Sequence, residues 1–437
     1  MQKTLITGCL IMPMTAEGGD PKYFTGSVAL EGNRIVLVTS DEARAEEFRA
    51  ANPGVREVDG RGKLLMPGLI NTHTHVAMTL MRSFADDIPL MAWLNDHVWP
   101  FESHLGAAEI AVGARLGMAE MLLGGTTTLV DMYWHESAVG RVADQIGIRA
   151  VLCPSFVDGK RMEEFERDLP ETVKVAEGCD RLSVRIAPHS AYSCSTENLR
   201  RAMELARGYG IGLHTHVSET LDEQRMIRER YGRTPSEYLR DIGFFEIPTL
   251  AAHCVHVSEG DIEILGEYGV TAMHNPQSNM KLASGIAPVP RMIAAGVNVS
   301  IGTDGSSSNN DLDMWEEMRT ASFLQKVADG DPSVMPAWEI LEMATVNGAE
   351  AIGMGDRLGR IAEGYIADMV MLDIEKPHFY PRNDMVANVV YCAKAGDVDT
   401  VFVDGREVVS GGMVTGLDMG GLFREVETTV ARIKSKL

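Results

Sequence analysis

The chain lacks several features that would assign it to a particular class of protein. Its six cysteines are scattered, and no two are spaced as C-x-x-C: Cys9, Cys153, Cys179, Cys194, Cys254 and Cys392. This spacing argues against both a disulfide framework and a thiolate zinc site, so we expect a cytoplasmic protein. No apolar run approaches the roughly 20 residues of a membrane span. No G-x-G-x-x-G follows a strand pattern, which argues against a dinucleotide-binding fold.

Basic residues are also scarce. The chain has 40 Lys and Arg against 62 Asp and Glu, a formal net charge of −22 at pH 7. An acidic surface repels the phosphates of nucleic acids and of anionic membranes. We therefore expect neither nucleic acid nor a membrane as a partner. Nothing in the composition sets the number of subunits, so a homo-oligomer stays an open alternative.

The middle of the chain alternates short apolar runs with longer helical patterns. Runs rich in Val, Ile, Thr and Leu predict strands at 64–75, 126–133, 149–156, 182–190, 211–219, 249–256, 270–275 and 297–305. Amphipathic segments such as 107–125 and 196–210 lie between them and end in glycine, a common helix stop. Strands alternating with helices in this way are typical of a (β/α)₈ TIM barrel. An open doubly wound sheet is the alternative architecture.

The two ends of the chain have a different pattern, with short β runs joined by hairpin-like turns. Neither end is long enough to make a core alone. We therefore predict a small β-sandwich domain built from residues 1–65 and 366–437, beside a catalytic barrel of residues 66–365. A chain of 437 residues, 45% of them hydrophobic, has enough material for both.

Two histidines mark the end of the first predicted strand, in the stretch GLINTHTHVAMTL (68–80). Alternate residues of a strand point to one face, so His73 and His75 point the same way. In a TIM barrel the carboxyl ends of the strands form the active-site face. Two neutral imidazoles there suit a divalent metal. By itself, however, an H-x-H pair is a weak signal and more often consists of two ordinary polar loop histidines.

Other chemistry-bearing residues follow later predicted strands. HTHVSE holds His214, His216 and Glu219, and GTDG places Asp304 after the last strand. Histidines also fall at the ends of other predicted strands: His189, His253, His256 and His274. Such clustering favours a metal centre at the barrel mouth, although the spacing does not say whether His214 or His216 binds the metal. We expect His256 and His274 to be ordinary core histidines.

Together these motifs resemble the amidohydrolase superfamily. The resemblance covers nearly the whole chain and rests on PGLINTHTH (67–75), the His216-x-x-Glu219 pair, His253 and GTDGSSSNNDLDM (302–314). Residues 80–102 and 274–285 are similar to the one-metal branch that deaminates 5′-methylthioadenosine and S-adenosylhomocysteine. No lysine ends the third or fourth predicted strand, which favours one metal over a lysine-bridged pair.

The resemblance implies a metal site and a set of catalytic roles. One divalent metal, Zn²⁺ first and Fe²⁺ as the alternative, would be held by His73, His75, His216 and Asp304. Such a metal lowers the pKa of a water molecule toward about 7, and Asp304 would take the proton released. Glu219 would protonate the ring nitrogen and carry protons to the leaving ammonia. His253 would hydrogen-bond the attacking oxygen.

The resemblance also implies residues that bind the substrate. Glu219 and Asp304 would face the reacting ring, while Glu102 and His189 would hold the sugar hydroxyls and the heterocycle. From the residues alone, Glu102 could instead be exposed and His189 could serve another side chain. Trp93 and Trp99 either line the pocket or only pack in the core.

The implied activity is the hydrolytic deamination of 5′-modified adenosines to the inosine analogue and ammonia. After the third strand, only Lys160 and Arg161 could meet the carboxylate of S-adenosylhomocysteine. We therefore expect small 5′ groups, as in 5′-methylthioadenosine, 5′-deoxyadenosine or adenosine. One alternative is a deaminase or chlorohydrolase of another N-heterocycle, such as guanine, an oxidised purine, a pterin or an aminotriazine. The other is a non-catalytic metal-binding protein.

Overall fold

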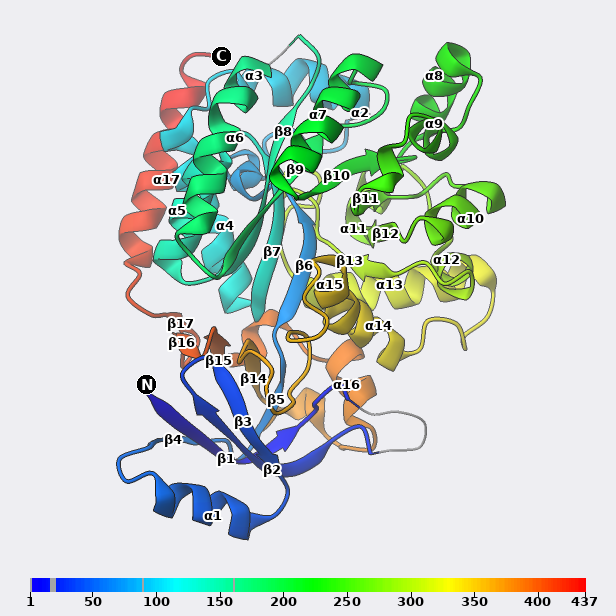
Figure 1. Cartoon of the computed structure of the whole chain (residues 1–437). Coiled ribbons are helices and arrows are strands. Elements are labelled where there is room, and N and C mark those ends of the chain that lie inside the picture. The colour runs from blue at the N-terminus through cyan, green and yellow to red at the C-terminus, as the bar shows by residue number, and fades with distance from the viewer. Residues whose placement is uncertain (1, 16–20, 89, 160–161) are drawn as a thin grey trace.

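The middle of the chain forms an eight-stranded parallel barrel with helices around it (Figure 1). The computed structural model describes residues 2–15, 21–88, 90–159 and 162–437, so Lys160 and Arg161 lie outside the described residues. The strands follow one another in chain order: β6 (Leu69–Thr74), β7 (Thr126–Tyr133), β8 (Arg149–Phe156), β9 (Leu182–Pro188), β10 (Gly212–Val217), β11 (Thr249–His253), β12 (Thr271–His274) and β13 (Val299–Ile301). The predicted TIM barrel is confirmed, and each predicted strand region contains a barrel strand.

Helices cover the outside of the barrel and follow the predicted amphipathic pattern. In α7 (Thr196–Tyr209) the buried residues Leu199, Ala202, Met203 and Ala206 recur at helical spacing, and the helix ends at Gly210 in the left-handed region. The other helices between β6 and β14 are α2 (Leu90–Trp93), α3 (Trp99–Glu102), α4 (Ala107–Leu123), α5 (Glu136–Ile146), α6 (Met162–Glu177), α8 (Leu221–Tyr231), α9 (Pro235–Asp241), α10 (Glu259–Glu267), α11 (Pro276–Lys281), α12 (Val289–Ala294), α13 (Met314–Asp329), α14 (Ala337–Ala344) and α15 (Val346–Ala351). Within the described part of the chain, no helix has the length and apolar character needed to span a bilayer.

Side chains of β6 close the barrel against the segment that contains β13. The Thr72 hydroxyl donates to the carbonyl of Ile301 (2.9 Å). The Asn71 side chain donates to Thr303 Oγ1 (2.8 Å) and accepts from the Thr303 backbone N–H (3.0 Å). The backbone N–H of Asp304 then donates to the carbonyl of His73 (2.9 Å). Barrel closure therefore brings the predicted site residues of the first and last strands together.

Strands from both chain ends form a second, nine-stranded mixed sheet below the barrel (Figure 1). It contains β1 (Lys3–Ile11), β2 (Phe24–Glu31), β3 (Arg34–Thr39), β4 (Arg56–Asp59), β5 (Lys63–Pro67), β14 (Met369–Asp373), β15 (Val398–Val403), β16 (Arg406–Ser410) and β17 (Met413–Val414). The predicted strand 64–75 is thus two strands, because β5 joins this sheet and β6 begins the barrel. The division into residues 1–65 with 366–437 and residues 66–365 stays our proposal, with β5 as the strand that crosses it.

The remaining helices belong to the terminal segments: α1 (Glu42–Ala51), α16 (Met385–Tyr391) and α17 (Met419–Lys434). The last of these runs along α4 on the outside of the barrel (Figure 1). Ion pairs at Arg115–Glu425 (3.0 Å) and Arg432–Glu109 (2.6 Å) accompany this contact. The C-terminal segment therefore packs on both the terminal sheet and the barrel.

A buried ion pair joins the barrel to the terminal sheet. Arg149, the first residue of β8, donates through Nε and Nη2 to the two carboxylate oxygens of Asp368 (2.7 and 3.1 Å), just before β14. The side chains are only 3% and 1% exposed. Asp368 also accepts the backbone N–H of Asp404 (2.7 Å). This carboxylate thus neutralises a buried guanidinium and holds the turn before β16.

We expect Asp368→Asn to lower the free energy of unfolding by about 3 kcal/mol. It removes the charge of the nearest partner of Arg149 and leaves only the more distant Asp404 carboxylate, 3.7 Å away. The matched control is Glu171→Gln, since the Arg141–Glu171 pair is about half exposed, at 50% and 47%. Exposed pairs contribute little, so this control should change stability much less. Urea denaturation followed by tryptophan fluorescence measures both, and equal effects would contradict the role given to the buried pair.

Candidate metal centre and active-site cleft

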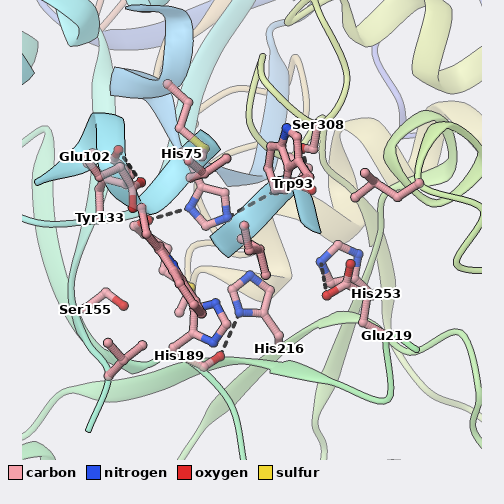
Figure 2. A pocket seen from close by; sticks show the side chains of 18 of the residues that line it. His75, Trp93, Glu102, Tyr133, Ser155, His189, His216, Glu219, His253 and Ser308 are labelled. Atoms are coloured by element: carbon pink, nitrogen blue, oxygen red, sulfur yellow. Dashed lines mark hydrogen bonds and ion pairs between the residues drawn. The ribbon is translucent and has the colours of Figure 1, made fainter. Parts of the chain in front are cut away.

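A cleft of about 730 Å³, its open mouth included, lies at the carboxyl ends of the barrel strands (Figure 2). This volume is within the usual range for small-molecule sites. The structure brings these predicted site residues to its wall: His75, Trp93, Trp99, Glu102, His189, His216, Glu219, His253 and Asp304. His73 is fully buried beside Asp304, while His214 is fully buried behind His73.

The orientation of two histidines is set by backbone carbonyls. His75 Nδ1 lies 2.6 Å from the carbonyl oxygen of Met132, and His216 Nδ1 lies 2.7 Å from that of His189. Because a carbonyl only accepts, each Nδ1 carries a proton and donates it. When either ring is neutral, its Nε2 atom presents a lone pair. This arrangement is common for histidines that bind a metal.

His73 is oriented by another histidine. Its Nδ1 lies 3.0 Å from Nε2 of His214. Its Nε2 is buried without a hydrogen-bond partner among the described residues and lies 3.4 Å from a carboxylate oxygen of Asp304. A buried polar atom with no partner is costly. A cation beside Nε2 would satisfy it.

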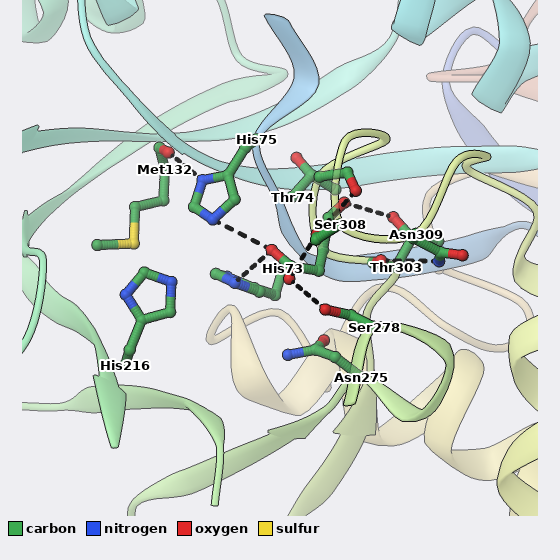
Figure 3. A network of polar contacts seen from close by, with 12 residues as sticks. His73, Thr74, His75, Met132, His216, Asn275, Ser278, Thr303, Ser308 and Asn309 are labelled. Atoms are coloured by element: carbon green, nitrogen blue, oxygen red, sulfur yellow. Dashed lines mark hydrogen bonds and ion pairs between the residues drawn. The ribbon is translucent and has the colours of Figure 1, made fainter. Parts of the chain in front are cut away.

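Asp304 presents one oxygen to the histidines and uses the other for structure. Figure 3 shows His73, His75, Ser278 and Ser308 gathered around this point. Oδ1 lies 3.1 Å from His75 Nε2, whereas Oδ2 accepts from the hydroxyls of Ser278 (2.6 Å) and Ser308 (2.8 Å). The backbone of Asp304 has a φ of 60°, a conformation that costs a non-glycine residue free energy. The hydrogen bond from its N–H to His73 helps to hold that conformation.

The donor atoms converge closely enough to hold a divalent cation. His73, His75 and Asp304 form one group whose donor atoms lie within 4.8 Å of one another, and His73, His216 and His253 form another. Both groups share His73. Imidazole nitrogens with a carboxylate oxygen suit Zn²⁺ or Fe²⁺. The partnerless Nε2 of His73 lies where the two groups meet, so the residues fit a metal.

Burial and mutual contacts shape the charges of this cluster. Burial lowers the pKa of His73 to about 4 and that of His189 to about 3, and it lowers the pKa of His216 as well. These rings are therefore neutral at pH 7 and can act as ligands. Burial also disfavours the charged form of His75, but the Asp304 carboxylate raises the pKa of His75 to about 9. A cation bound between the two would take the place of that proton.

Glu219 and His253 lie next to each other on one side of the cleft (Figure 2), and the His253 ring stacks on that of His216 with centroids 5.3 Å apart. The carboxylate lies 3.9 Å from Nε2 of His253, whose Nδ1 is 2.9 Å from the side-chain oxygen of Asn279. Burial raises the pKa of the Glu219 carboxyl. A carboxyl with a raised pKa can carry a proton near neutral pH, as a general acid requires.

The other side of the cleft holds Glu102. It is only 5% exposed, and the Tyr133 hydroxyl donates to its carboxylate (2.6 Å). Nδ1 of His189 lies 2.9 Å from the Ser193 hydroxyl, and its ring lies 4.6 Å from the ring of His216. The sequence alternative of an exposed Glu102 is therefore wrong. Trp93 is both buried and part of the cleft wall.

Sequence reasoning missed several residues that support the site. Ser278 and Asn279 lie in HNPQSN, and Ser308 lies in GTDGSSS; both segments were singled out as motifs without roles for these side chains. Tyr133 ends a predicted strand, which was an available signal for a residue at the barrel mouth. The partners of these side chains lie at least four and as many as 31 positions away along the chain, so spacing could not identify them.

Comparison with known proteins identifies the family of this chain. The Amidohydrolase family profile matches residues 64–408. A 5-methylthioadenosine/S-adenosylhomocysteine deaminase of Pelotomaculum thermopropionicum is 43% identical over 441 residues, covering 100% of both chains. A 5′-deoxyadenosine deaminase of Methanothermobacter thermautotrophicus is 43% identical over 415 residues, covering 93% of this chain and 95% of that one. The crystal structure of an adenosine deaminase from Xanthomonas campestris with bound zinc superposes with a TM-score of 0.93 at 32% identity, covering 99% of both chains. As its motifs predicted, the chain belongs to the amidohydrolase family.

Proposed function

We propose that this protein is a metal-dependent deaminase of 5′-modified adenosines. It replaces the 6-amino group with a 6-oxo group and releases ammonia. The observation that carries the proposal is a single cleft that combines a metal-competent cluster, the buried acid Glu219 and the buried carboxylate Glu102. Relatives that match over the full length have names that describe the same chemistry.

His73, His75, His216 and Asp304 hold the metal in this proposal, with Zn²⁺ first and Fe²⁺ as the alternative. A divalent metal held there would supply a water molecule acidic enough to act as a nucleophile near neutral pH. Oδ1 of Asp304 would accept the proton of that water. The two serine hydroxyls on Oδ2 keep the carboxylate in the orientation needed for this step.

Glu219 and His253 act on the purine ring. Glu219 donates its proton to the ring nitrogen next to the carbon under attack, then takes the proton of the hydroxyl added to that carbon and passes it to the leaving amine. The proton held by Asp304 then returns to Glu219, so that both protons gained by the products come from water. His253, held at Nδ1 by Asn279, directs Nε2 into the cleft and hydrogen-bonds the attacking oxygen. Their separation of 3.9 Å allows both to contact one small reacting group.

Glu102 and His189 bind the nucleoside, and Trp99 forms part of the cleft wall. A carboxylate can accept hydrogen bonds from both vicinal hydroxyls of a ribose. Among the described residues that line the cleft, none is a lysine or arginine. The cleft therefore favours an uncharged 5′ group, as in 5′-methylthioadenosine, 5′-deoxyadenosine or adenosine, over the carboxylate of S-adenosylhomocysteine.

We also propose that the protein acts in the cytoplasm. Every cysteine of the chain lies within the described residues and is unpaired, which fits a reducing cytoplasm. Assembly into a homo-oligomer stays a prediction. The rival activities on guanine, an oxidised purine, a pterin or an aminotriazine would use the same metal cluster but give Glu102 no ribose to bind.

A zinc assay on two variants tests the ligand set. His216→Asn removes a proposed ligand, so the purified protein should lose most of its zinc. His253→Asn is the matched control and should keep about one zinc ion per chain, because His253 is assigned to the substrate side. Metal content after dialysis, measured by plasma mass spectrometry, decides between them. Loss of zinc in both variants would instead favour the group of His73, His216 and His253.

A substrate panel tests the activity. The zinc-loaded protein is mixed with 5′-methylthioadenosine, 5′-deoxyadenosine, adenosine, S-adenosylhomocysteine, guanine and an aminotriazine, and ammonia release is followed. We expect the adenosines with small 5′ groups to have the highest kcat/KM, because the described cleft wall offers no cation to a carboxylate. Turnover of only a free base or a triazine would refute the nucleoside assignment and leave the metal site intact.

The role of Glu102 is tested with Glu102→Gln, which keeps an acceptor for Tyr133 but removes the charge. KM for adenosine should rise about 10- to 100-fold, the loss expected for hydrogen bonds to a charged group. Adenosine lacking both ribose hydroxyls is the matched control, since variant and wild type should process it at similar kcat/KM. An equal loss on both substrates would mean that Glu102 does not contact the ribose.

A further inference from the structure

The turn that carries Glu219 is held by a second buried glutamate. Glu223 lies in the first turn of α8 and is fully buried. One of its oxygens accepts the backbone N–H of Ser218 (3.0 Å), and the other accepts the backbone N–H of Glu219 (2.8 Å). Burying a carboxylate is costly. Here both carboxylate oxygens accept hydrogen bonds from the backbone of the same turn.

This arrangement differs from an ordinary helix cap. The N-cap of α8 is Thr220, whose hydroxyl accepts the backbone N–H of Glu223 (3.2 Å). In a capping box the glutamate side chain would bond to the N–H of the N-cap residue itself. Glu223 instead reaches the two residues before the cap. One of them, Ser218, has a φ of 55°, so the carboxylate supports a backbone conformation that is unfavourable for serine.

Gln224 links this turn to the loop after β11. Its side-chain amide donates to the Ser218 hydroxyl (3.0 Å) and to the carbonyl of His256 (2.7 Å). The backbone N–H of His256 also donates to the carbonyl of Ser218 (2.9 Å). One loop carries Glu219 and the other follows His253. The cluster therefore maintains the 3.9 Å separation of the two side chains assigned to proton transfer.

We propose that Glu223 is a positioning residue for Glu219 and that Gln224 assists it. Glu223 holds the strained turn so that the Glu219 carboxyl points into the cleft beside His253. It is not among the residues that line the cleft, so it acts through Glu219 and not on the substrate. This inference rests on the proposed role of Glu219 as the proton donor.

The next helix offers a matched control. Asp261 in α10 is 1% exposed, and its carboxylate accepts the backbone N–H of Ser258 (2.8 Å) in an ordinary capping box. Neither Asp261 nor Ser258 is among the residues that line the cleft. Replacing each acid by its amide therefore removes a similar buried carboxylate from the start of a helix. Only in Glu223→Gln does the affected turn carry a site residue.

The kinetic test uses zinc-loaded full-length protein and 5′-methylthioadenosine. Glu223→Gln should lower kcat about 10- to 100-fold, the usual effect of removing a support of a site residue, with KM within about twofold. Asp261→Asn should keep both constants within about twofold, even if it lowers the unfolding temperature. If kcat falls by the same factor in Glu223→Gln and Asp261→Asn, the proposal is overturned, because the loss would then follow from a general loss of stability.

A double-mutant cycle tests whether Glu223 acts through Glu219. In the Glu219→Gln background, adding Glu223→Gln should produce no further loss of kcat. The same fold-loss in both backgrounds would overturn the proposal. If Glu223→Gln does not fold, Gln224→Met replaces it in the cycle. That variant should lower kcat about threefold to tenfold in the wild-type background and leave the Glu219→Gln background unchanged.

Hydrogen exchange followed by mass spectrometry gives a readout that does not depend on the reaction. Peptides containing Ser218 and Glu219 should exchange faster in Glu223→Gln and at the wild-type rate in Asp261→Asn. Unchanged exchange in Glu223→Gln would overturn the positioning role even for an active enzyme. If the wild type deaminates no adenosine, the proposed function fails. Faster exchange in Glu223→Gln would still show that Glu223 stabilises the turn.

Discussion

The hydrogen bond from the backbone N–H of Asp304 to the carbonyl of His73, 2.9 Å long, joins the two edges of the barrel sheet. The rest of the site depends on this closure. It places a carboxylate from the last strand against two histidines from the first, 3.1 and 3.4 Å away. Asn71 and Thr72 strengthen the same junction from the strand interior. A single set of contacts thus completes the fold and assembles the metal-competent cluster.

Around that junction, the protein uses structural hydrogen bonds to orient chemical groups. Backbone carbonyls fix the rings of His75 and His216, and serine hydroxyls fix one oxygen of Asp304. Three of the non-glycine residues with positive φ lie in this region: Ser218, His253 and Asp304. Such strain persists only where surrounding contacts hold it. Here those contacts include a buried glutamate and a run of loop-to-loop hydrogen bonds.

The cleft divides into two chemical ends, which accounts for the substrate class proposed here. One end gathers the imidazoles, Asp304 and Glu219, the groups needed to activate water and move protons. The other has Glu102, held by Tyr133, where a sugar can bind. Family membership alone would leave the substrate open, because one fold supports many reactions. The proposed preference for adenosines with small 5′ groups rests on the described lining of this cleft, which includes no lysine or arginine.

Much of the molecule could be predicted from the sequence because its signals are local. Strand and helix periodicity established the barrel, and the spacing of His73 with His75 and of His216 with Glu219 identified candidate chemistry. The pairing of both chain ends into one sheet also followed from their shared β pattern. The split of 64–75 into β5 and β6 did not, since only the pairing partners show that β5 leaves the barrel.

Only the tertiary structure could decide the interactions between residues that are distant in sequence. Whether His214 or His216 faces the cleft depends on how β10 sits beside His73, which strand alternation alone cannot say. The burial of Glu102 depends on Tyr133, 31 positions away. The hydrogen bonds of Glu223 to the backbone of Ser218 and Glu219 depend on the conformation of that turn, which the sequence does not reveal. By itself, the sequence determined which elements form and which residues can do chemistry, because those properties are local. The packing of the barrel decided which of those residues meet, because contact requires the whole sheet to close.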